Sequence, residues 1–446
     1  MVNIIRIKNK IKNFKKKIYI DGDKSLSIRW ALMASQAIGT SKAFNLLRSE
    51  DVLNTLNCLK KLGIEINLNK KFCKITGKGL NNFNQRKNLK LNAGNSGTLG
   101  RLILGMLAGY SKKTKLSGDK SLSKRDFSRV TRPLQEFGVK FFPKNKSSLP
   151  IYFQGTKFLR PIKYFENKGS AQCKSSVMLA ALNSPGKTII KAKKSRNHTE
   201  LLFKYLKIPI KIKKKKKYDL IKIKGLKNFK SFNYNIPADP SSSAFFIMLT
   251  VLSKNSSILI KNCLVNENRI GFYKILKLMG AKIFFKNKKI YKGEKIADIY
   301  CKSSKNLKSI NLSKNFNISS CIDEFISIFI IASFSNGIST FKGMGIEMNK
   351  KESPRMDWSF KILKMIGVRT KRIGNHGIKI YGNPNLKLNK KYILKNYLKD
   401  HRLAMNAIIL ALARGGSWKI YDAKKSILTS FPSFLKIAKS LGGKIN

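Results

Sequence analysis

The sequence predicts an α/β fold that is built from repeated helix–strand units and divided between two domains. The chain has 446 residues, which is too long for a single core of ordinary size. One pattern recurs six times: an amphipathic helix that ends at a glycine, or at Lys207 in one copy, and is followed at once by a short strand rich in β-branched residues. A Pro/Ser-rich break also lies near mid-chain, at residues 234–243.

Each copy of the pattern is marked by the residue at which its helix stops. Glycine is favoured there because it adopts the left-handed conformation that ends a helix, and the strand that follows alternates apolar and polar residues. The marker positions are separated by 75, 69, 73, 87 and 75 residues. This near-constant spacing indicates six related α/β units, three in each domain. The markers are Gly63, Gly138, Lys207, Gly280, Gly367 and Gly442.

The mid-chain break predicts the domain boundaries. It precedes a helix that begins near Ala244, and Asp239 or Ser241 is suited to cap that helix. We expect residues 22–239 to form one domain. We expect residues 1–21 to join residues 240–446 in the other.

The net charge of +70 is the most unusual feature of the composition. A basic nucleic-acid-binding protein is one hypothesis that it suggests, and such a protein should show clustered arginines with interleaved aromatic residues. Only sixteen of the 92 basic residues are arginine, and the lysines are spread along the whole chain, as codon bias in an AT-rich genome would produce. The one dense run, residues 213–217, lies away from every motif described below. We therefore interpret the charge as a solvated surface.

Cysteine usage and hydropathy predict a cytoplasmic protein. The six cysteines form no C-x-x-C motif and have no histidines at metal-binding spacing, so we expect reduced thiols and no metal site. The longest apolar runs, 325–334 and 404–413, are shorter than the roughly 18 residues that a membrane span needs. The Lys-rich start, residues 11–17, lacks a hydrophobic signal core, and a short organellar leader remains an alternative.

Residues 22–29, with the sequence GDKSLSIR, combine a lysine, two hydroxyls and an arginine just ahead of an apolar run. This is typical of a helix start that binds an anion, with Ser25 or Ser27 as the cap and Lys24 and Arg29 as cations. On one copy alone, a capped surface helix is the favoured interpretation. Residues 118–125, however, repeat seven of the eight residues.

Other polar stretches also precede predicted helices. Residues 92–98 and 169–176 are turns of small residues that could present backbone N–H groups to a phosphate, although a tight turn without a ligand explains them equally well. Asp323 stands just before a fully apolar segment, where a carboxylate is either a helix cap or a reactive group. Residues 349–355 and 400–405 place cations beside carboxylates.

Nine motifs in order over nearly the whole chain resemble those of the 3-phosphoshikimate 1-carboxyvinyltransferases, also called 5-enolpyruvylshikimate-3-phosphate synthases. This resemblance implies the enolpyruvyl transferase fold, an inside-out α/β barrel with two similar domains of three βαβαββ units each. The motifs are GDKSLSIR, GNSGTLGR, SAQCKSS, SRNHTE, ADPSSSAFF, CIDEF, KKESPR, DHRLAM and TSFP.

The resemblance also implies the reaction. The family transfers the enolpyruvyl group of phosphoenolpyruvate to the 5-hydroxyl of shikimate 3-phosphate, in the shikimate pathway of aromatic amino-acid biosynthesis. Phosphate leaves by C–O cleavage through a tetrahedral intermediate. This chemistry needs a base, an acid and several cations, and no metal or organic cofactor.

By resemblance, Asp323 is the base on the 5-hydroxyl, while Glu352 and Lys24 deliver and recover the proton at the methylene carbon. Which of these two is the acid stays open. The implied phosphoenolpyruvate site contains Lys24, Gly97, Arg125, Gln172, Lys351, Arg355 and Arg402. The implied shikimate 3-phosphate site contains Lys24, Ser25, Arg29, Ser170, Ala171, Gln172, Ser195, Arg196, Asp323 and Lys351.

The main alternative enzyme is the sister family that enolpyruvylates UDP-N-acetylglucosamine. Its members carry a reactive cysteine in the second-unit loop, whereas no cysteine occurs here between Cys73 and Cys173. The sequence also departs from its relatives at Asp21, Ile28 and Thr429, which bears on affinity more than on activity. We expect a monomer that binds two small substrates and has no specific nucleic-acid or membrane partner.

Overall fold

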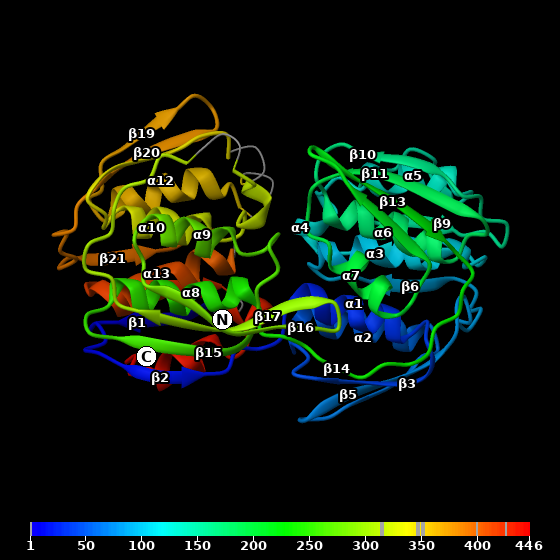
Figure 1. Ribbon diagram of the computed structural model, residues 1–446, viewed down its shortest axis with the longest axis horizontal. Coiled ribbons are helices and arrows are strands. Elements are labelled where there is room, and N and C mark those ends of the chain that lie inside the picture. Colours follow the sequence, from blue (N-terminus) through cyan, green and yellow to red (C-terminus); the bar gives the residue numbers. More distant parts are fainter. Residues whose placement is uncertain (1, 313–315, 345–347, 349–352, 398–399, 424–425) are drawn as a thin grey trace. The chain divides into compact units, whose positions relative to one another are not determined.

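The computed structural model describes residues 2–312, 316–344, 348, 353–397, 400–423 and 426–446 (Figure 1). The contacts divide the chain into two compact units. Unit 1 takes Met1–Asp21, Pro237–Lys289 and Lys295–Asn446, and unit 2 takes Gly22–Ile236 and Ile290–Glu294. The chain changes from unit 2 to unit 1 after Ile236, three residues before the boundary predicted from the Pro/Ser-rich break.

Unit 2 contains three sheets of four strands each. Its strands are β3 (Ile38–Phe44), β4 (Glu65–Leu68), β5 (Phe72–Lys78), β6 (Leu89–Asn92), β7 (Thr114–Ser117), β8 (Lys140–Phe142), β9 (Ile151–Gln154), β10 (Lys163–Glu166), β11 (Lys187–Lys193), β12 (Ile210–Lys214), β13 (Tyr218–Lys224) and β14 (Tyr234–Asn235). The sheet orders are β14-β3-β5-β4, β6-β7-β9-β8 and β10-β11-β13-β12. In each sheet the first two strands are parallel and the last two form an antiparallel hairpin.

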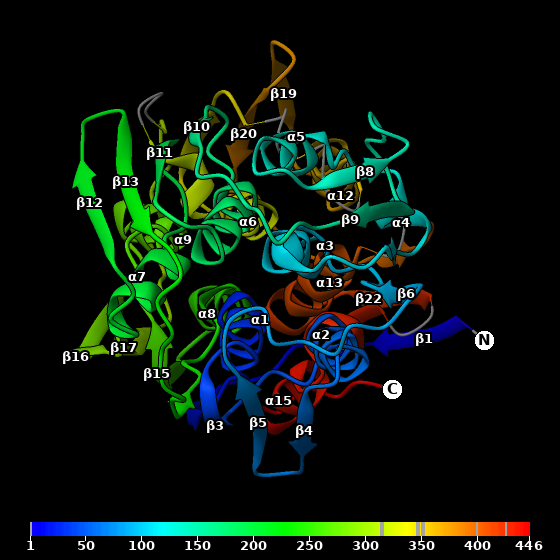
Figure 2. The ribbon, with the colours of Figure 1, turned by 90° about the vertical axis from the view of Figure 1, so that its right-hand side faces the viewer.

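The helices of unit 2 are α1 (Lys24–Ala34), α2 (Glu50–Lys61), α3 (Gly97–Met106), α4 (Lys120–Ser123), α5 (Ser128–Glu136), α6 (Ala171–Leu182) and α7 (His198–Tyr205), with the 3₁₀ turn η1 (Leu107–Gly109). The almost wholly buried helices are α1, α3 and α6. Figure 2 shows these three helices inside the unit, with the β3-β5-β4 sheet below them. Their central position follows from their composition, since a helix that is apolar on most sides is stable only when it is buried.

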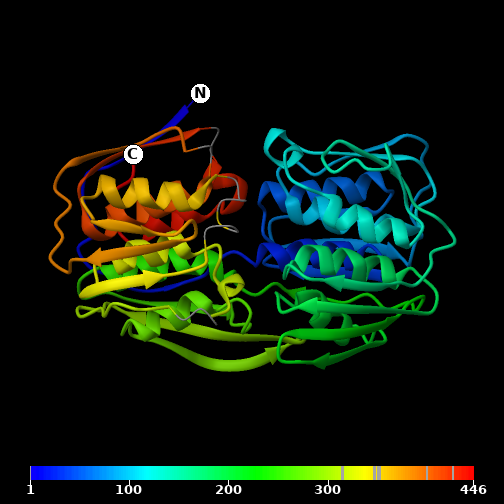
Figure 3. The same cartoon turned by 90° about the horizontal axis from the view of Figure 1, so that it is seen from above.

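Unit 1 also contains three sheets, one of four strands and two of three strands among the described residues. Its strands are β1 (Val2–Ile7), β2 (Lys15–Ile18), β15 (Ser257–Leu264), β16 (Ile283–Tyr291), β17 (Glu294–Lys302), β18 (Gly337–Phe341), β19 (Thr370–Ile373), β20 (Gly377–Gly382), β21 (Lys391–Leu394) and β22 (Ser417–Ala423). They form the sheets β16-β17-β15-β2, β18-β20-β19 and β1-β22-β21. Strand β1 pairs antiparallel with β22, so the start of the chain lies beside its end (Figure 3).

The helices of unit 1 are α8 (Pro240–Leu252), α9 (Gly271–Leu278), α10 (Phe325–Ala332), α12 (Arg355–Met365), α13 (His401–Arg414), α14 (Ser426–Ser430) and α15 (Phe434–Ser440), with the 3₁₀ turn η2 (Ile318–Ser320). Helices α8, α10 and α13 contact one another and are buried along almost their whole length. The two apolar runs that are too short to span a membrane therefore form α10 and α13 in the core. Among the described residues, none of the helices has the length and apolar character that crossing a membrane requires.

The predicted helix-ending residues confirm the repeat. The backbone φ angle at Gly63 is +82° and at Gly442 is +98°, so both lie in the left-handed region that only glycine adopts easily. Lys207 takes the same position in the third unit with a φ of +55°, at a conformational cost that glycine avoids. These angles mark the end of a helix at each predicted position, and the mixed α/β architecture of both units confirms the predicted fold class.

Two of the predicted helix caps can be compared with the structure. Asp239 caps α8 as expected, because its side chain accepts a hydrogen bond from the Ser241 N–H. The prediction for α1 was wrong: Asp23 is the cap, with its carboxylate 2.8 Å from the Leu26 N–H. A carboxylate one residue before the helix reaches this N–H group directly, so Ser25 and Ser27 fall inside α1 instead.

Candidate active site

The described motif residues lie in two groups, one in each unit. Nearly all of them stand in the first turns of a helix or in the segment just before one. Backbone N–H groups at such helix starts point outward and favour anions. The unit 2 group comprises Lys24, Ser25, Arg29, Gly97, Arg125, Ser170, Ala171, Gln172, Ser195 and Arg196. The unit 1 group comprises Asp323, Arg355 and Arg402.

Arg29 is buried on α1, with 4% of its surface exposed. Its guanidinium donates to Thr199 Oγ1 at 2.8 Å, to Ser175 Oγ at 3.0 Å and to the Ser25 carbonyl at 3.1 Å. Burial lowers the pKa of Arg29 to about 10, so the side chain stays cationic at neutral pH. A buried guanidinium held by neutral oxygens keeps its positive charge available to an anionic ligand.

Ser195 and Arg196 lie just before α7, the helix whose Thr199 accepts a hydrogen bond from Arg29. The Ser195 hydroxyl oxygen is buried, and none of the described residues gives it a hydrogen-bond partner. Arg196 is close enough to Arg29 for its charge to lower the pKa of Arg29 further. Two neighbouring guanidiniums and a buried hydroxyl form an arrangement that suits a phosphate.

Lys24 is the first residue of α1, and its ammonium nitrogen lies 2.9 Å from Asp51 Oδ2 at the start of α2. Both side chains are partly exposed, at 29% and 14%. The sequence motif did not predict this carboxylate partner, because Asp51 belongs to a different helix. The contact holds the lysine at the helix start.

A second set of cations surrounds the start of α3. Arg101 Nη1 donates to Gln172 Oε1 at 2.9 Å, and Arg125 Nη2 donates to Asn95 Oδ1 at 3.2 Å. A Cβ atom on Gly97 would lie 2.8 Å from Arg101 Nη1 and 3.2 Å from Arg125 Nη1. Glycine at this position therefore lets both guanidiniums approach the helix start.

Gln172 joins this cation set to the first turn of α6. Its amide nitrogen donates to Thr98 Oγ1 at 3.1 Å while its oxygen accepts from Arg101. Ser170 is the cap of α6 and accepts from the Cys173 N–H at 3.3 Å, which places Ala171 as the first helical residue. The predicted contributors from residues 170–172 thus lie at one helix start.

In unit 1, Arg355 forms an ion pair with Asp400. Its Nε lies 2.8 Å and its Nη2 3.3 Å from the two carboxylate oxygens of Asp400, and neither side chain is more than 2% exposed. Asp400 also caps α13 by accepting from the Arg402 N–H at 3.0 Å. One buried carboxylate therefore fixes both predicted arginines of this unit.

Asp323 lies in the turn before α10, between these two arginines. Its Oδ1 is 3.4 Å from Arg355 Nη1, and its Oδ2 is 4.0 Å from Arg402 Nη2. Arg402 Nη1 also donates to the Asp323 carbonyl at 3.2 Å. Glu324, and not Asp323, occupies the cap position of α10, and its side chain makes no capping bond. The helix-cap explanation for Asp323 was therefore wrong.

Two predicted site residues, Lys351 and Glu352, lie outside the described residues. Thr429 is described on α14, where its hydroxyl donates to the Ser426 carbonyl at 2.6 Å. This hydrogen bond gives Thr429 a structural role within α14.

Sequence reasoning gave no role to Asp400, Arg101, Ser175 or Thr199, although each contacts a predicted site residue. All four stand inside the quoted motifs, two to four positions from a residue that did receive a role. Their presence in those motifs could have identified these four residues as candidates. Their contacts could not be predicted, because the sequence does not show which helices pack together.

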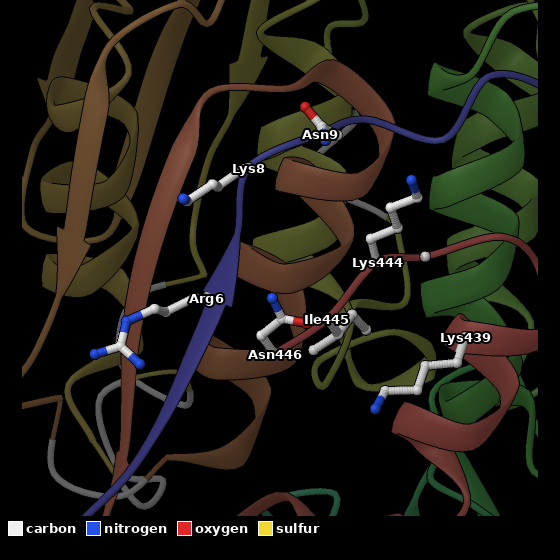
Figure 4. Close-up of a pocket in the computed structure, with 8 residues that line it drawn as sticks. Arg6, Lys8, Asn9, Lys439, Lys444, Ile445 and Asn446 are labelled. Carbon is white, nitrogen blue, oxygen red and sulfur yellow. The ribbon is translucent and has the colours of Figure 1, made fainter.

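A surface cavity of about 530 Å³ lies elsewhere in unit 1, between β1 and the last residues of the chain (Figure 4). Four exposed basic side chains line it, Arg6, Lys8, Lys439 and Lys444. Its lining contains none of the motif residues, and exposed lysines are common throughout this chain. The motif residues therefore mark the candidate site better than this cavity does.

Comparison with known proteins identifies the family that these motifs resemble. A family model described as EPSP synthase (3-phosphoshikimate 1-carboxyvinyltransferase) matches residues 8–437. Proteins named 3-phosphoshikimate 1-carboxyvinyltransferase are similar to the chain. The one from Caldicellulosiruptor saccharolyticus is 38% identical, over 94% of this chain and 95% of its own length. The one from Persephonella marina is 35% identical, over 96% of each chain.

Solved structures show the same likeness. EPSP synthase from Acinetobacter baumannii superposes with a TM-score of 0.88 at 30% identity, over 100% of this chain and 99% of that one. The enolpyruvyl transferase NikO from Streptomyces tendae gives a TM-score of 0.74 at 12% identity, over 100% of this chain and 98% of that one. The second comparison shows a shared fold alone.

Proposed function

Because the chain belongs to the EPSP synthase (3-phosphoshikimate 1-carboxyvinyltransferase) family, we propose that its two groups of motif residues divide the work of that family's reaction. The enzyme transfers the enolpyruvyl group of phosphoenolpyruvate to shikimate 3-phosphate in the shikimate pathway. We also propose that units 1 and 2 are the two domains of the transferase, with residues 22–239 as the predicted extent of one of them.

The reaction sets three chemical demands. The 5-hydroxyl of shikimate 3-phosphate must lose a proton to become a nucleophile, the methylene carbon of phosphoenolpyruvate must gain one, and the phosphate and carboxylate groups must be held by cations. Phosphate then leaves as the tetrahedral intermediate collapses. Each demand can be assigned to residues of this chain.

The phosphate of shikimate 3-phosphate is assigned to the Arg29 region of unit 2. Arg29 and Arg196 supply two positive charges, and the buried Ser195 hydroxyl can donate a hydrogen bond. The other proposed contributors are Lys24, Ser25, Ser170, Ala171 and Gln172, with Ala171 acting through its backbone.

The anionic groups of phosphoenolpyruvate are assigned to the remaining cations. In unit 2, the proposed cations are Lys24 and Arg125, which stand at helix starts. Gly97 leaves room for the Arg125 guanidinium. Gln172 orients these residues through its hydrogen bond with Arg101. In unit 1, the ligands are Arg355 and Arg402, which Asp400 holds in place. Lys351 is proposed for both substrates by resemblance.

The proton transfers are assigned to Asp323, Glu352 and Lys24. Asp323 is the proposed base by resemblance, and its carboxylate is 15% exposed and lies between two arginines. Arginine does not titrate near neutral pH, so the acceptor of the hydroxyl proton in this group is the carboxylate. Glu352 and Lys24 share the proton at the methylene carbon, and both assignments of the acid are kept.

We further propose that the enzyme acts as a cytoplasmic monomer. All six cysteines lie in the described part of the chain, where they are buried and none forms a disulfide, which suits a reducing compartment. Light scattering coupled to size-exclusion chromatography tests the oligomeric state, and a dimer mass would reject it.

The observation that carries the proposal is Asp323 lying beside Arg355 and Arg402, in motifs that match the family in order. A coupled phosphate-release assay tests it, with phosphoenolpyruvate and either shikimate 3-phosphate or UDP-N-acetylglucosamine as acceptor. We expect turnover with shikimate 3-phosphate alone. Turnover with the sugar nucleotide alone would assign the chain to the sister activity instead.

A further inference from the structure

Lys174 and Glu200 form a buried ion pair between α6 and α7 of unit 2. The ammonium nitrogen of Lys174 lies 2.6 Å from Glu200 Oε1, and the two side chains are 1% and 3% exposed. Neither residue belongs to the proposed substrate ligands. A buried charge pair is costly to assemble and is weak evidence for stability alone, so its position calls for another explanation.

The residues next to this pair hold Arg29. Ser175 follows Lys174 on α6 and Thr199 precedes Glu200 on α7, and their hydroxyl oxygens lie 2.7 Å apart. Arg29 donates to both hydroxyls. The ion pair and the hydroxyl pair are thus two adjacent links between the same two helix starts, and Arg29 is bonded to the second link.

The three protein acceptors of Arg29 leave part of its guanidinium for a ligand. The side chain has five N–H groups. One is taken by Thr199, one by Ser175 and one by the Ser25 carbonyl, so among the described residues one N–H on each terminal nitrogen has no protein acceptor. These two N–H groups can donate to the oxygens of an anionic ligand, such as a phosphate.

Glu200 also acts on Arg29 through its charge. It is the strongest of the charges that favour the cationic form of Arg29, ahead of Asp23 and Glu294, while Arg196 opposes them. Glu200 pairs with Lys174, whereas the recorded acceptors of Arg29 are Thr199, Ser175 and Ser25. Its carboxylate therefore favours the cationic form of Arg29 through its charge.

We propose that the Lys174–Glu200 pair is a positioning pair that sets the spacing of α6 and α7 and so orients the Arg29 guanidinium toward the phosphate of shikimate 3-phosphate. This inference rests on the proposed function of the same site. It assigns to both residues an effect on the affinity for the phosphorylated acceptor and none on the chemical step.

The test measures steady-state kinetics of the full-length enzyme with the variants Glu200→Gln and Lys174→Met. We expect KM for shikimate 3-phosphate to rise roughly tenfold or more, as for a weakened charge-assisted bond, with kcat and KM for phosphoenolpyruvate little changed. Glu65→Gln and Lys204→Met are the matched controls, since they remove the same charges from exposed positions of unit 2. The controls should keep all parameters of the unmodified enzyme.

A double-mutant cycle with Arg29→Gln separates positioning from general destabilisation. If the pair acts through Arg29, adding Glu200→Gln to Arg29→Gln raises KM for shikimate 3-phosphate no further. If the double variant instead showed the product of the two single-variant increases in KM for shikimate 3-phosphate, the proposal would be overturned. An unchanged KM in a folded Glu200→Gln enzyme would also overturn it.

Lys174→Met/Glu200→Met keeps the test decisive if the single variants do not fold, because an apolar pair of similar volume removes the burial cost of a lone charge. We expect this variant to fold and to retain the raised KM; a normal KM would refute the inference. Turnover by the unmodified enzyme tests the proposed function, and the ratio of variant to unmodified KM tests the positioning pair. The two failures are therefore distinguishable.

Discussion

The Arg355 guanidinium and the Asp400 carboxylate form an ion pair in which Asp400 is fully buried and Arg355 is 2% exposed, with Nε 2.8 Å from Oδ2. The same carboxylate caps α13 and accepts from the Ser353 hydroxyl at 2.8 Å. Asp400 thus connects two helix starts that carry proposed phosphoenolpyruvate ligands.

Replacing Asp400 by Asn should therefore destabilise the protein and weaken phosphoenolpyruvate binding together. Asp400 is the closer of the two carboxylates beside the buried Arg355 guanidinium, and breaking a buried ion pair by removing one partner costs up to roughly 3–5 kcal/mol. Asp357→Asn is the control, because the Asp357–Arg372 pair has nearly the same separation, 2.8 Å, but is 43% and 48% exposed. Thermal unfolding and KM should change in the first variant and stay constant in the second; equal changes in both would contradict the role of Asp400.

Replacing Asp323 by Asn should impair the chemical step. The amide keeps the size of the side chain but cannot accept the hydroxyl proton, and loss of a general base lowers kcat about 10²- to 10⁴-fold. The KM values should change little. Arg402→Ala gives the contrast, because loss of a ligand cation should mainly raise KM for phosphoenolpyruvate. If kcat and KM changed in the same way in both variants, this separation of roles would be rejected.

Gly97→Ala should disturb the cations of unit 2 without unfolding the helix. The added Cβ would lie 2.8 Å from Arg101 Nη1, which is closer than van der Waals contact allows, and alanine is otherwise favourable in a helix. We expect KM for phosphoenolpyruvate to rise several-fold while the thermal midpoint stays within a few degrees, as for a mild substitution. An unchanged KM would show that the site tolerates the displaced guanidinium.

The cysteines should be inert in the folded enzyme. Burial raises the pKa of the Cys58 thiol to about 11 and that of Cys73 to about 12, and it also raises the pKa values of Cys173 and Cys301. A thiol with a pKa near 11 is only about 0.1% thiolate at pH 8, and the thiolate is the reactive form. Iodoacetamide at pH 8 should therefore leave activity intact and label the cysteines only after denaturation. Rapid inactivation would point to a reactive cysteine, as in the sister family.

The repeated fold could be predicted because its signals are local. Gly63 and Gly442 stop their helices through their own backbone conformation, and the strands follow at once. The cap of α1 was missed because Asp23, Ser25 and Ser27 are all good capping residues, and the geometry of the helix start decides among them. Local sequence alone does not contain that geometry.

The candidate site was only partly predictable for the same reason. Motifs identified Arg29 and Arg355, whereas their partners Thr199 and Asp400 are 170 and 45 residues away in sequence. Such pairs depend on how helices from distant segments pack. The role of Lys174 with Glu200 could be inferred only after α6 and α7 had been placed together.

The most direct test of the central claim follows the bridging oxygen of phosphoenolpyruvate. Substrate carrying a heavy oxygen isotope between carbon and phosphorus is incubated with shikimate 3-phosphate and the enzyme, and the products are analysed by mass spectrometry. Enolpyruvyl transfer by C–O cleavage predicts that the released phosphate carries the isotope and that the acceptor gains an unlabelled enolpyruvyl group. Label retained in pyruvate or in the acceptor, with unlabelled phosphate, would mean P–O cleavage and would contradict the proposed reaction.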